Sequence, residues 1–279
     1  MIRTIAATSI LALSAAGAAH AASGYALAED GSTLVVMADI SAPGEIETYE
    51  LNMPLSAIAY RPVTGDLVGF SADAIYTVDP ASGEMTDLEA SFGDDATIGD
   101  GAMVAFDFNN AIDAVRAVTT TGDNLVYFPE GFGDNDDRAN TVVRMTDLAY
   151  AEGDDNADAT PMVFANAYTN AIDGETASET FQYGLDAETD ALVSVANNEG
   201  TLETVAPIMV DGEAVDLAPM GGFEILSASE GENEAYAILQ IEGAESAGLY
   251  MIDLETGEAT MQADLGMGGF TGFAASNSM

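Results

Sequence analysis

The chain has 279 residues, and its 48 Asp and Glu against 5 basic residues, all of them arginine, give a formal charge of −43 at pH 7. Since proteins bind phosphate backbones and anionic lipids through Lys and Arg, this balance argues against a nucleic-acid or anionic-membrane partner. Hydrophobic residues make up 48% of the chain, so the acidity is not that of a disordered polypeptide and a folded core is expected.

Residues 1–21 are predicted to be a signal peptide. Arg3 precedes an apolar run from Ile5 to Ala18, and the following Ala19-His20-Ala21 has the small-x-small pattern cut by signal peptidase. The alternative, a transmembrane anchor, is disfavoured because the run is rich in Ala and shorter than the roughly 20 apolar residues of a membrane span. We therefore expect one mature domain, residues 22–279, in the periplasm or outside the cell and without membrane insertion.

The predicted mature chain contains no His, Cys, Lys or Trp. This composition excludes Ser-His-Asp and Cys-His mechanisms, Schiff bases, and zinc sites with nitrogen or sulfur ligands. Carboxylate acid/base chemistry, oxygen-ligated cations or no catalysis remain, and we expect no cofactor. We interpret the acidity as adaptation to a saline habitat; the alternative is a surface that gathers cations or repels anionic polymers.

An internal repeat is the most informative feature downstream of the leader. Residues 76–86 recur at 250–260, and a weaker copy runs from Tyr183 to Val193. Each copy reads as a β-hairpin: a strand, a turn opened by Asp, a Gly that tolerates positive φ, and a return strand. A hairpin cannot bury its apolar face alone, and each copy follows another pair of short strands. Four strands per unit is the composition of a propeller blade.

Five segments resemble one another as first strands of such units, with aromatic residues alternating or next to Gly: 56–60, 105–108, 164–168, 222–225 and 271–274. The last one lacks a following hairpin, whereas residues 25–28, 33–38 and 45–51 lack a first strand. The two ends complete each other. We predict an all-β, five-bladed β-propeller closed by pairing of the C-terminal strand with the N-terminal blade, which removes an exposed sheet edge. The alternative fold is a β-sandwich.

Four segments follow one another in the middle of the chain: residues 105–118, Thr121-Gly122-Asp123-Asn124-Leu125, Ala167-Tyr168-Thr169-Asn170 and residues 198–202. They resemble segments of a bacterial family of secreted proteins described as domain of unknown function 4394. The chain departs from the family pattern where Asn110 replaces Pro, Ala114 replaces the first Arg of a pair, and Val126 replaces another Arg, which puts a basic pocket in doubt. The resemblance implies a propeller-like architecture and no established activity.

Asp113 and Arg116 stand three residues apart in a chain with few cations. One interpretation is a structural salt bridge that ties the loop of this unit to its neighbour; the other is that Arg116 points into the central channel and binds an anionic or carbonyl-bearing ligand. Polar residues just past the first strands are predicted to ring one mouth of the channel, although such residues also satisfy turns. The predicted ligand-binding residues are therefore Arg61, Asn109, Asn110, Asp113, Arg116 and Asn170.

Acidic clusters at residues 94–95, 134–137 and 154–158 offer oxygen ligands suited to Ca²⁺, but the two longer ones miss the EF-hand spacing, and we interpret them as solvated loops without a metal. Asp107 and Glu224 are the candidate carboxylates for glycoside hydrolysis.

We favour a non-catalytic binding module over an enzyme, with an unidentified small molecule, glycan or protein as partner. The alternative is a carboxylate-dependent glycan hydrolase. An axial pocket with converging carboxylates would favour the enzyme, and a channel plugged by apolar side chains would favour the binding module.

Overall fold

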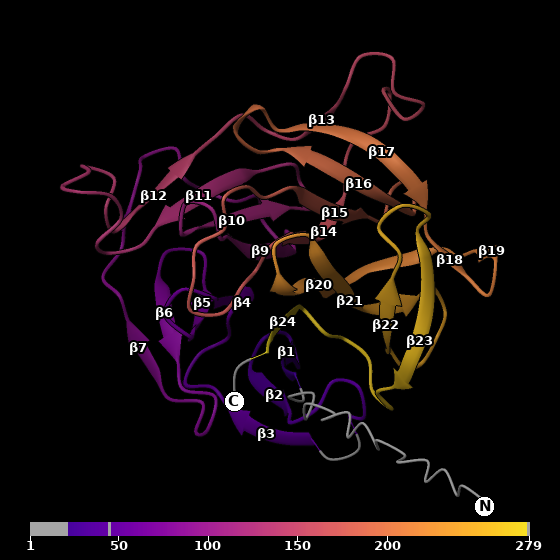
Figure 1. Cartoon of the computed structure of the whole chain (residues 1–279), viewed down its shortest axis with the longest axis horizontal. Helices are drawn as coiled ribbons and strands as arrows, with labels where there is room; N and C mark the ends of the chain where they lie inside the picture. The colour runs from indigo at the N-terminus through magenta and orange to yellow at the C-terminus, as the bar shows by residue number, and fades with distance from the viewer. Residues whose placement is uncertain (1–21, 44–45, 278–279) are drawn as a thin grey trace, which may run out of the picture.

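The computed structural model describes residues 22–43 and 46–277, whose strands form five sheets around one axis like the blades of a propeller (Figure 1). The predicted all-β, five-bladed propeller is confirmed. The predicted signal peptide lies outside the described residues. No helix among the described residues has the length and apolar character needed to cross a membrane.

The blades follow one another along the chain, and in each blade the first strand named lies at the axis and the others follow outward. Blade one consists of β24 (Gly272–Ser276), β1 (Ser23–Ala28), β2 (Thr33–Met37) and β3 (Ile46–Glu50). Blade two consists of β4 (Ala57–Arg61), β5 (Asp66–Phe70), β6 (Ile75–Val78) and β7 (Met85–Asp87). Blade three consists of β9 (Val104–Asn109), β10 (Ala114–Thr119), β11 (Asn124–Phe128), β12 (Thr141–Arg144) and β8 (Ser91–Phe92).

Blade four consists of β14 (Val163–Tyr168), β15 (Gln182–Asp186), β16 (Ala191–Ala196), β17 (Thr201–Pro207) and β13 (Ala149–Tyr150), with the short 3-10 helix η1 (Asn197–Glu199) between β16 and β17. Blade five consists of β20 (Leu217–Ser229), β21 (Glu232–Ile241), β22 (Gly248–Ile252), β23 (Glu258–Asp264), β18 (Met209–Val210) and β19 (Glu213–Ala214).

Three blades carry more than the four strands expected from the repeat. The short strands β8, β13 and β18 lie in the connections between blades and pair parallel to the outer strands β12, β17 and β23. Each therefore covers an outer edge that would otherwise expose unpaired backbone groups.

The ends of the ring meet in blade one. Strand β24 pairs antiparallel with β1, with Tyr25 opposite Ala274 and Ser23 opposite Ser276. The predicted pairing of the C-terminal strand into the N-terminal blade is confirmed. Figure 1 shows β24 beside β1 at the centre of the ring.

The core lies between neighbouring blades, because both faces of each inner strand are covered. Ala59 packs in a cluster with Phe108 of blade three, whereas its neighbour Ile58 packs in a cluster with Leu34 of blade one. Burial on both faces explains why the inner strands read as nearly continuous apolar runs.

The repeated hairpins have the turn chemistry expected from the sequence. The side chains of Asp79 and Asp253 each accept a hydrogen bond of 2.9 Å from the backbone N–H two residues on. The glycines that follow, Gly83 and Gly257, have φ of 72° and 71°. An Asx turn closed by a left-handed Gly thus fixes the register of both hairpins.

Candidate functional site

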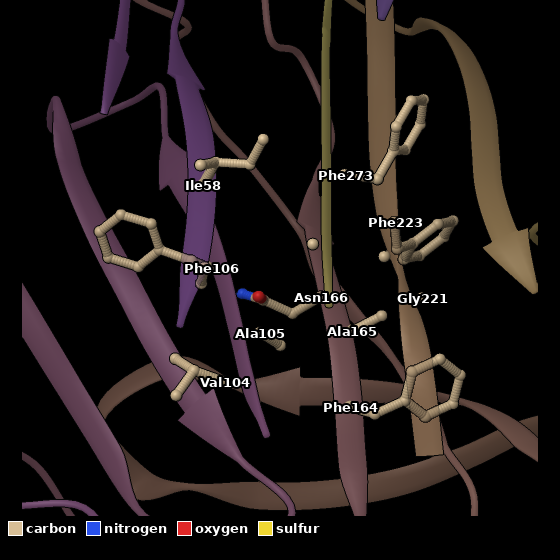
Figure 2. A pocket seen from close by; sticks show the side chains of 13 residues that line it. Ile58, Val104, Ala105, Phe106, Phe164, Ala165, Asn166, Gly221, Phe223 and Phe273 are labelled. Atoms are coloured by element: carbon tan, nitrogen blue, oxygen red, sulfur yellow. The ribbon is translucent and has the colours of Figure 1, made fainter. Parts of the chain in front are cut away.

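The inner strands leave little space along the axis of the propeller. The inner strands leave a cavity of about 10 Å³ on the axis, with Ile58, Phe106, Phe164, Phe223 and Phe273 in its walls (Figure 2). A cavity of this size holds one water molecule at most. The axis therefore has no room for a sugar ring or a peptide.

A polar side chain, that of Asn166, faces this small cavity. Asn166 is 1% exposed and points into the axial space from β14 (Figure 2), and neither its Oδ1 nor its Nδ2 has a hydrogen-bond partner among the described residues. A buried amide without partners is costly, and a single water has both the donors and the acceptors to satisfy it.

The two carboxylates nominated for glycoside hydrolysis lie on innermost strands, as expected, but they bind the backbone. Asp107 Oδ2 accepts the N–H of Tyr168 on the next innermost strand at 2.6 Å. Glu224 Oε2 accepts the N–H of Ala275 on β24 at 3.2 Å. Each acid thus accepts a hydrogen bond from a backbone N–H on the inner edge of the neighbouring blade, where no further strand pairs with it.

Burial dominates the electrostatics of these two acids. Both side chains are at most 3% exposed. Burial raises the pKa of Asp107 and of Glu224 well above their ordinary values, and for Glu224 the nearby Asp107 raises it further. Each acid is therefore easier to protonate than a surface carboxyl, but the closed axis gives a substrate no route to it.

The predicted polar ring lies at the C-terminal ends of the innermost strands, beneath a segment that we call the strap, residues 171–181. Asn110 Nδ2 donates to the carbonyl of Asn170 at 2.8 Å, and Asn170 Nδ2 donates to the carbonyl of Glu179 at 2.9 Å. The Thr180 hydroxyl donates to Asn109 Oδ1 at 2.9 Å. Asn109, Asn110 and Asn170 therefore bind the strap and the turns around it.

The strap leaves blade four and reaches across the end of the channel. Gly174 N–H donates to the carbonyl of Pro62, just after β4 of blade two, at 2.8 Å. Ser178 is hydrogen-bonded through its backbone N–H and its hydroxyl to the carboxylate of Glu230 in blade five. In Figure 1 the segment between β14 and β15 lies near the centre of the ring. This mouth of the channel is covered by the chain itself.

Asp113 and Arg116 do not pair with each other, and the ion pair that ties this loop to the neighbouring blade joins Asp113 to Arg61 instead. Asp113 lies at the tip of the β9–β10 turn, where its φ is 51°, and forms a two-point ion pair with Arg61 of blade two. Arg116 lies further along β10, among the side chains that face blade four. Asp113 therefore contacts blade two and Arg116 contacts blade four, although the two residues are close in sequence.

Arg116 is 4% exposed and does not line the axial cavity. Its guanidinium donates to Tyr168 Oη at 2.8 Å, Asn124 Oδ1 at 2.6 Å and Asn198 Oδ1 at 2.9 Å. The ion pairs of the described residues involve Arg61, Arg138 and Arg144, and Arg116 takes part in none of them. Arg116 thus joins blade three to blade four through neutral acceptors.

Replacing Arg116 with Ala is expected to destabilise the protein by about 3 kcal/mol, because charge-assisted hydrogen bonds are lost and buried acceptors are left without donors. Urea unfolding followed by circular dichroism measures the change. Arg138→Ala is the control: that side chain is 53% exposed, and solvent screens its pair with Asp136, so little change in stability is expected. Equal midpoints for the Arg116 variant and the wild type would contradict the structural role.

A pocket of about 310 Å³ lies between blades two and three. Val68, Phe108 and Tyr127 are buried apolar parts of its wall, and Arg61 lies at its edge. The Arg61 guanidinium stands 6.0 Å from the centre of the Phe108 ring, and Asp113 holds it from behind, with Nε 2.7 Å from Oδ1. An apolar pocket with a few fixed polar groups has the usual character of a small-molecule site.

The acidic clusters serve the loops in which they occur. Asp154 Oδ2 accepts the N–H of Thr204 at 2.7 Å and ties its loop to β17. Arg138 pairs with Asp136 and stacks over Phe128 at 4.7 Å from the ring centre. Among the described residues there is no group of three His, Cys, Asp or Glu side chains placed to hold a metal ion.

The family model described as Domain of unknown function (DUF4394) matches residues 35–274, from within β2 to within β24. The chain belongs to this family. No curated protein sequence matches the chain.

Among solved structures, this DUF4394 protein is similar to a protein of unknown function from Bacteroides caccae, with 10% identity, a TM-score of 0.41, and coverage of 92% of this chain and 100% of that one. A protein of unknown function from Bacteroides thetaiotaomicron has 13% identity, a TM-score of 0.45, and coverage of 90% and 56%. An auxiliary nutrient binding protein from the same species has 13% identity, a TM-score of 0.41, and coverage of 76% and 55%. The chain thus spans just over half the length of the last two proteins.

Proposed function

We propose that this DUF4394 propeller is a secreted, non-catalytic binding module that takes a small molecule with an apolar body into the pocket between blades two and three. The observation that carries the proposal is the pocket itself: about 310 Å³, walled by Phe108, Tyr127 and Val68, with a fixed ion pair at its edge. Its volume is at the lower end of the range of known ligand sites, which suits a compact ligand.

The closed axis supports binding over catalysis. A glycan hydrolase needs two carboxyl groups on opposite sides of a bound sugar. Asp107 and Glu224 are buried against backbone N–H groups, and the axial cavity admits no sugar. Of the six predicted ligand-binding residues, Arg61 and Asp113 remain in the proposal. Arg61 borders the pocket, and Asp113 fixes the orientation of the Arg61 side chain. Asn109, Asn110, Asn170 and Arg116 have partners within the fold.

The excess of acid is consistent with solubility of a secreted protein in a saline medium, because salt screens the self-repulsion of a highly charged surface. We keep this habitat, and the periplasmic or extracellular location, as part of the proposal.

Filling the pocket tests the proposal. Thr77 lines the pocket from β6 and is half-buried, so Thr77→Trp is expected to occupy the space without altering the core. We would screen short alkyl and aryl amines, alcohols and carboxylates by saturation-transfer NMR. Signals are expected with the wild type and are expected to be lost with Thr77→Trp.

The matched control is Thr260→Trp, on the exposed surface of β23 in blade five. It should retain the wild-type signals. If the Thr77 variant bound the same compounds as the wild type, the pocket would not be the binding site.

A further inference from the structure

The positive charge of Arg61, at the edge of the pocket, is paired with the negative charge of Asp113. Both Nε and Nη2 of Arg61 donate to the carboxylate of Asp113, so the two groups match each other in charge and geometry. The hydrogen bonds that Arg61 donates to Asp113 raise the pKa of Arg61. Asp113 therefore already balances the positive charge of Arg61, and Arg61 offers little attraction to an anionic ligand.

The other charged groups around the pocket are all acids. Asp66 and Glu130 line its opening and are exposed. An adjoining groove shares Asp66 and adds Asp79 and Glu84. None of these four carboxylates takes part in an ion pair of the described residues. A ligand entering the pocket thus passes carboxylates that form no ion pair within the described residues.

The apolar part of the wall also suits a cation. Phe108 and Tyr127 supply aromatic rings, and the Arg61 guanidinium already lies over Phe108. Aromatic faces attract ammonium groups, and the attraction adds to that of nearby carboxylates. Together, rings inside and carboxylates outside form a site for a positively charged group on an apolar body.

We infer that the pocket between blades two and three binds a monovalent organic ammonium with a short aliphatic or aromatic body. The inference rests on the proposed function and names the chemical class of its ligand. The aliphatic or aromatic part packs against Val68, Phe108 and Tyr127, and the ammonium group lies toward Asp66 and Glu130.

Three probes of matched length separate charge from size: pentylammonium, 1-pentanol and pentanoate. Their affinities for the full chain would be measured by titration NMR at pH 7 in low salt and in 1 M NaCl. We expect pentylammonium to bind about tenfold more tightly than pentanoate in low salt, and the difference to shrink in high salt, because exposed charges are screened.

Charge-neutralising variants locate the source of the preference. Asp66→Asn combined with Glu130→Gln is expected to lower the preference for the ammonium to about threefold or less. The control, Asp155→Asn combined with Glu203→Gln, removes the same charge from exposed positions on blade four and is expected to keep the preference. Thermal melts establish that all variants are folded.

Distinct results would overturn the inference. If pentanol or pentanoate bound as tightly as pentylammonium, the ligand class would be wrong while the pocket remained the binding site. If both double variants reduced the preference equally, the overall field of the protein would account for it instead. If none of the probes bound, or if Thr77→Trp bound them all like the wild type, the proposed function itself would fail.

Discussion

Deletion of residues 269–279 is expected to abolish the cooperative thermal transition of the propeller. The segment contains β24, which pairs with β1 and buries Phe270, Phe273 and Ala274 in two core clusters. Loss of one buried Phe side chain alone costs about 3–5 kcal/mol, and small domains have only about 5–15 kcal/mol of stability. Calorimetry of the truncated and full-length chains measures the result.

A single substitution tests the same packing without removing chain. A Cβ added at Gly222 of β20 would lie 2.3 Å from the backbone nitrogen of Phe273 and 2.6 Å from its Cβ. Gly222→Ala is therefore expected to lower the melting temperature strongly. Gly93→Ala is the control, because the nearest atom to its added Cβ is 3.4 Å away.

An unchanged melting temperature for the chain that lacks residues 269–279 would show that the stability of the ring does not depend on β24.

The second large effect concerns pH and the buried acids Asp107 and Glu224. Because burial raises their pKa in the folded protein, the folded state holds more protons than the unfolded state between the ordinary pKa and the raised one. The free energy of unfolding therefore falls as the pH rises through that window. Linkage gives a slope of about 1.4 kcal/mol per pH unit for each proton released.

Asp107→Asn and Glu224→Gln remove this dependence, since an amide does not titrate. We expect each variant to gain stability relative to the wild type as the pH rises from 4 to 8, measured by urea unfolding at each pH. The comparison with the wild type cancels the general repulsion among the remaining acids. A constant difference across this range would contradict the assignment of raised pKa values.

Asp123 is a buried acid whose pKa shifts in the opposite direction to those of Asp107 and Glu224. Burial alone would raise the pKa of Asp123, but hydrogen bonds from Gly99 N–H, Thr121 and Arg144 outweigh burial and lower it to about 2. Its contribution is present above the ordinary pKa of an Asp and is lost as the pH falls toward 2. Asp123→Asn is therefore expected to destabilise the protein at pH 7 and to have little effect near pH 2.

The sequence was sufficient to predict the ring because the inner strands carry a local signature. The five segments that contain Ile58, Phe106, Asn166, Phe223 and Phe273 are the five innermost strands. Aromatic residues and glycines recur there because five strands crowd one axis. The closure in blade one followed from counting strands at the two ends, which requires no knowledge of tertiary contacts.

The site was less predictable because it depends on contacts between blades. The ion pair of Arg61 with Asp113 joins residues 52 positions apart in the sequence, and no local pattern connects them. The strap has the composition of an ordinary loop, yet Gly174 reaches Pro62 of blade two. The pocket was missed because Val68, Phe108 and Tyr127 read as core residues, and only the tertiary packing leaves space between them.

The position of β24 also determines when the molecule can mature. A ribosome delivers β1 first and β24 last, so the inner edge of β1 stays unpaired until Ser276 has emerged. An unpaired edge is a template for joining another strand, and an arrested or shortened chain would carry it permanently. Ring closure thereby makes native pairing of β1 conditional on synthesis having passed β24.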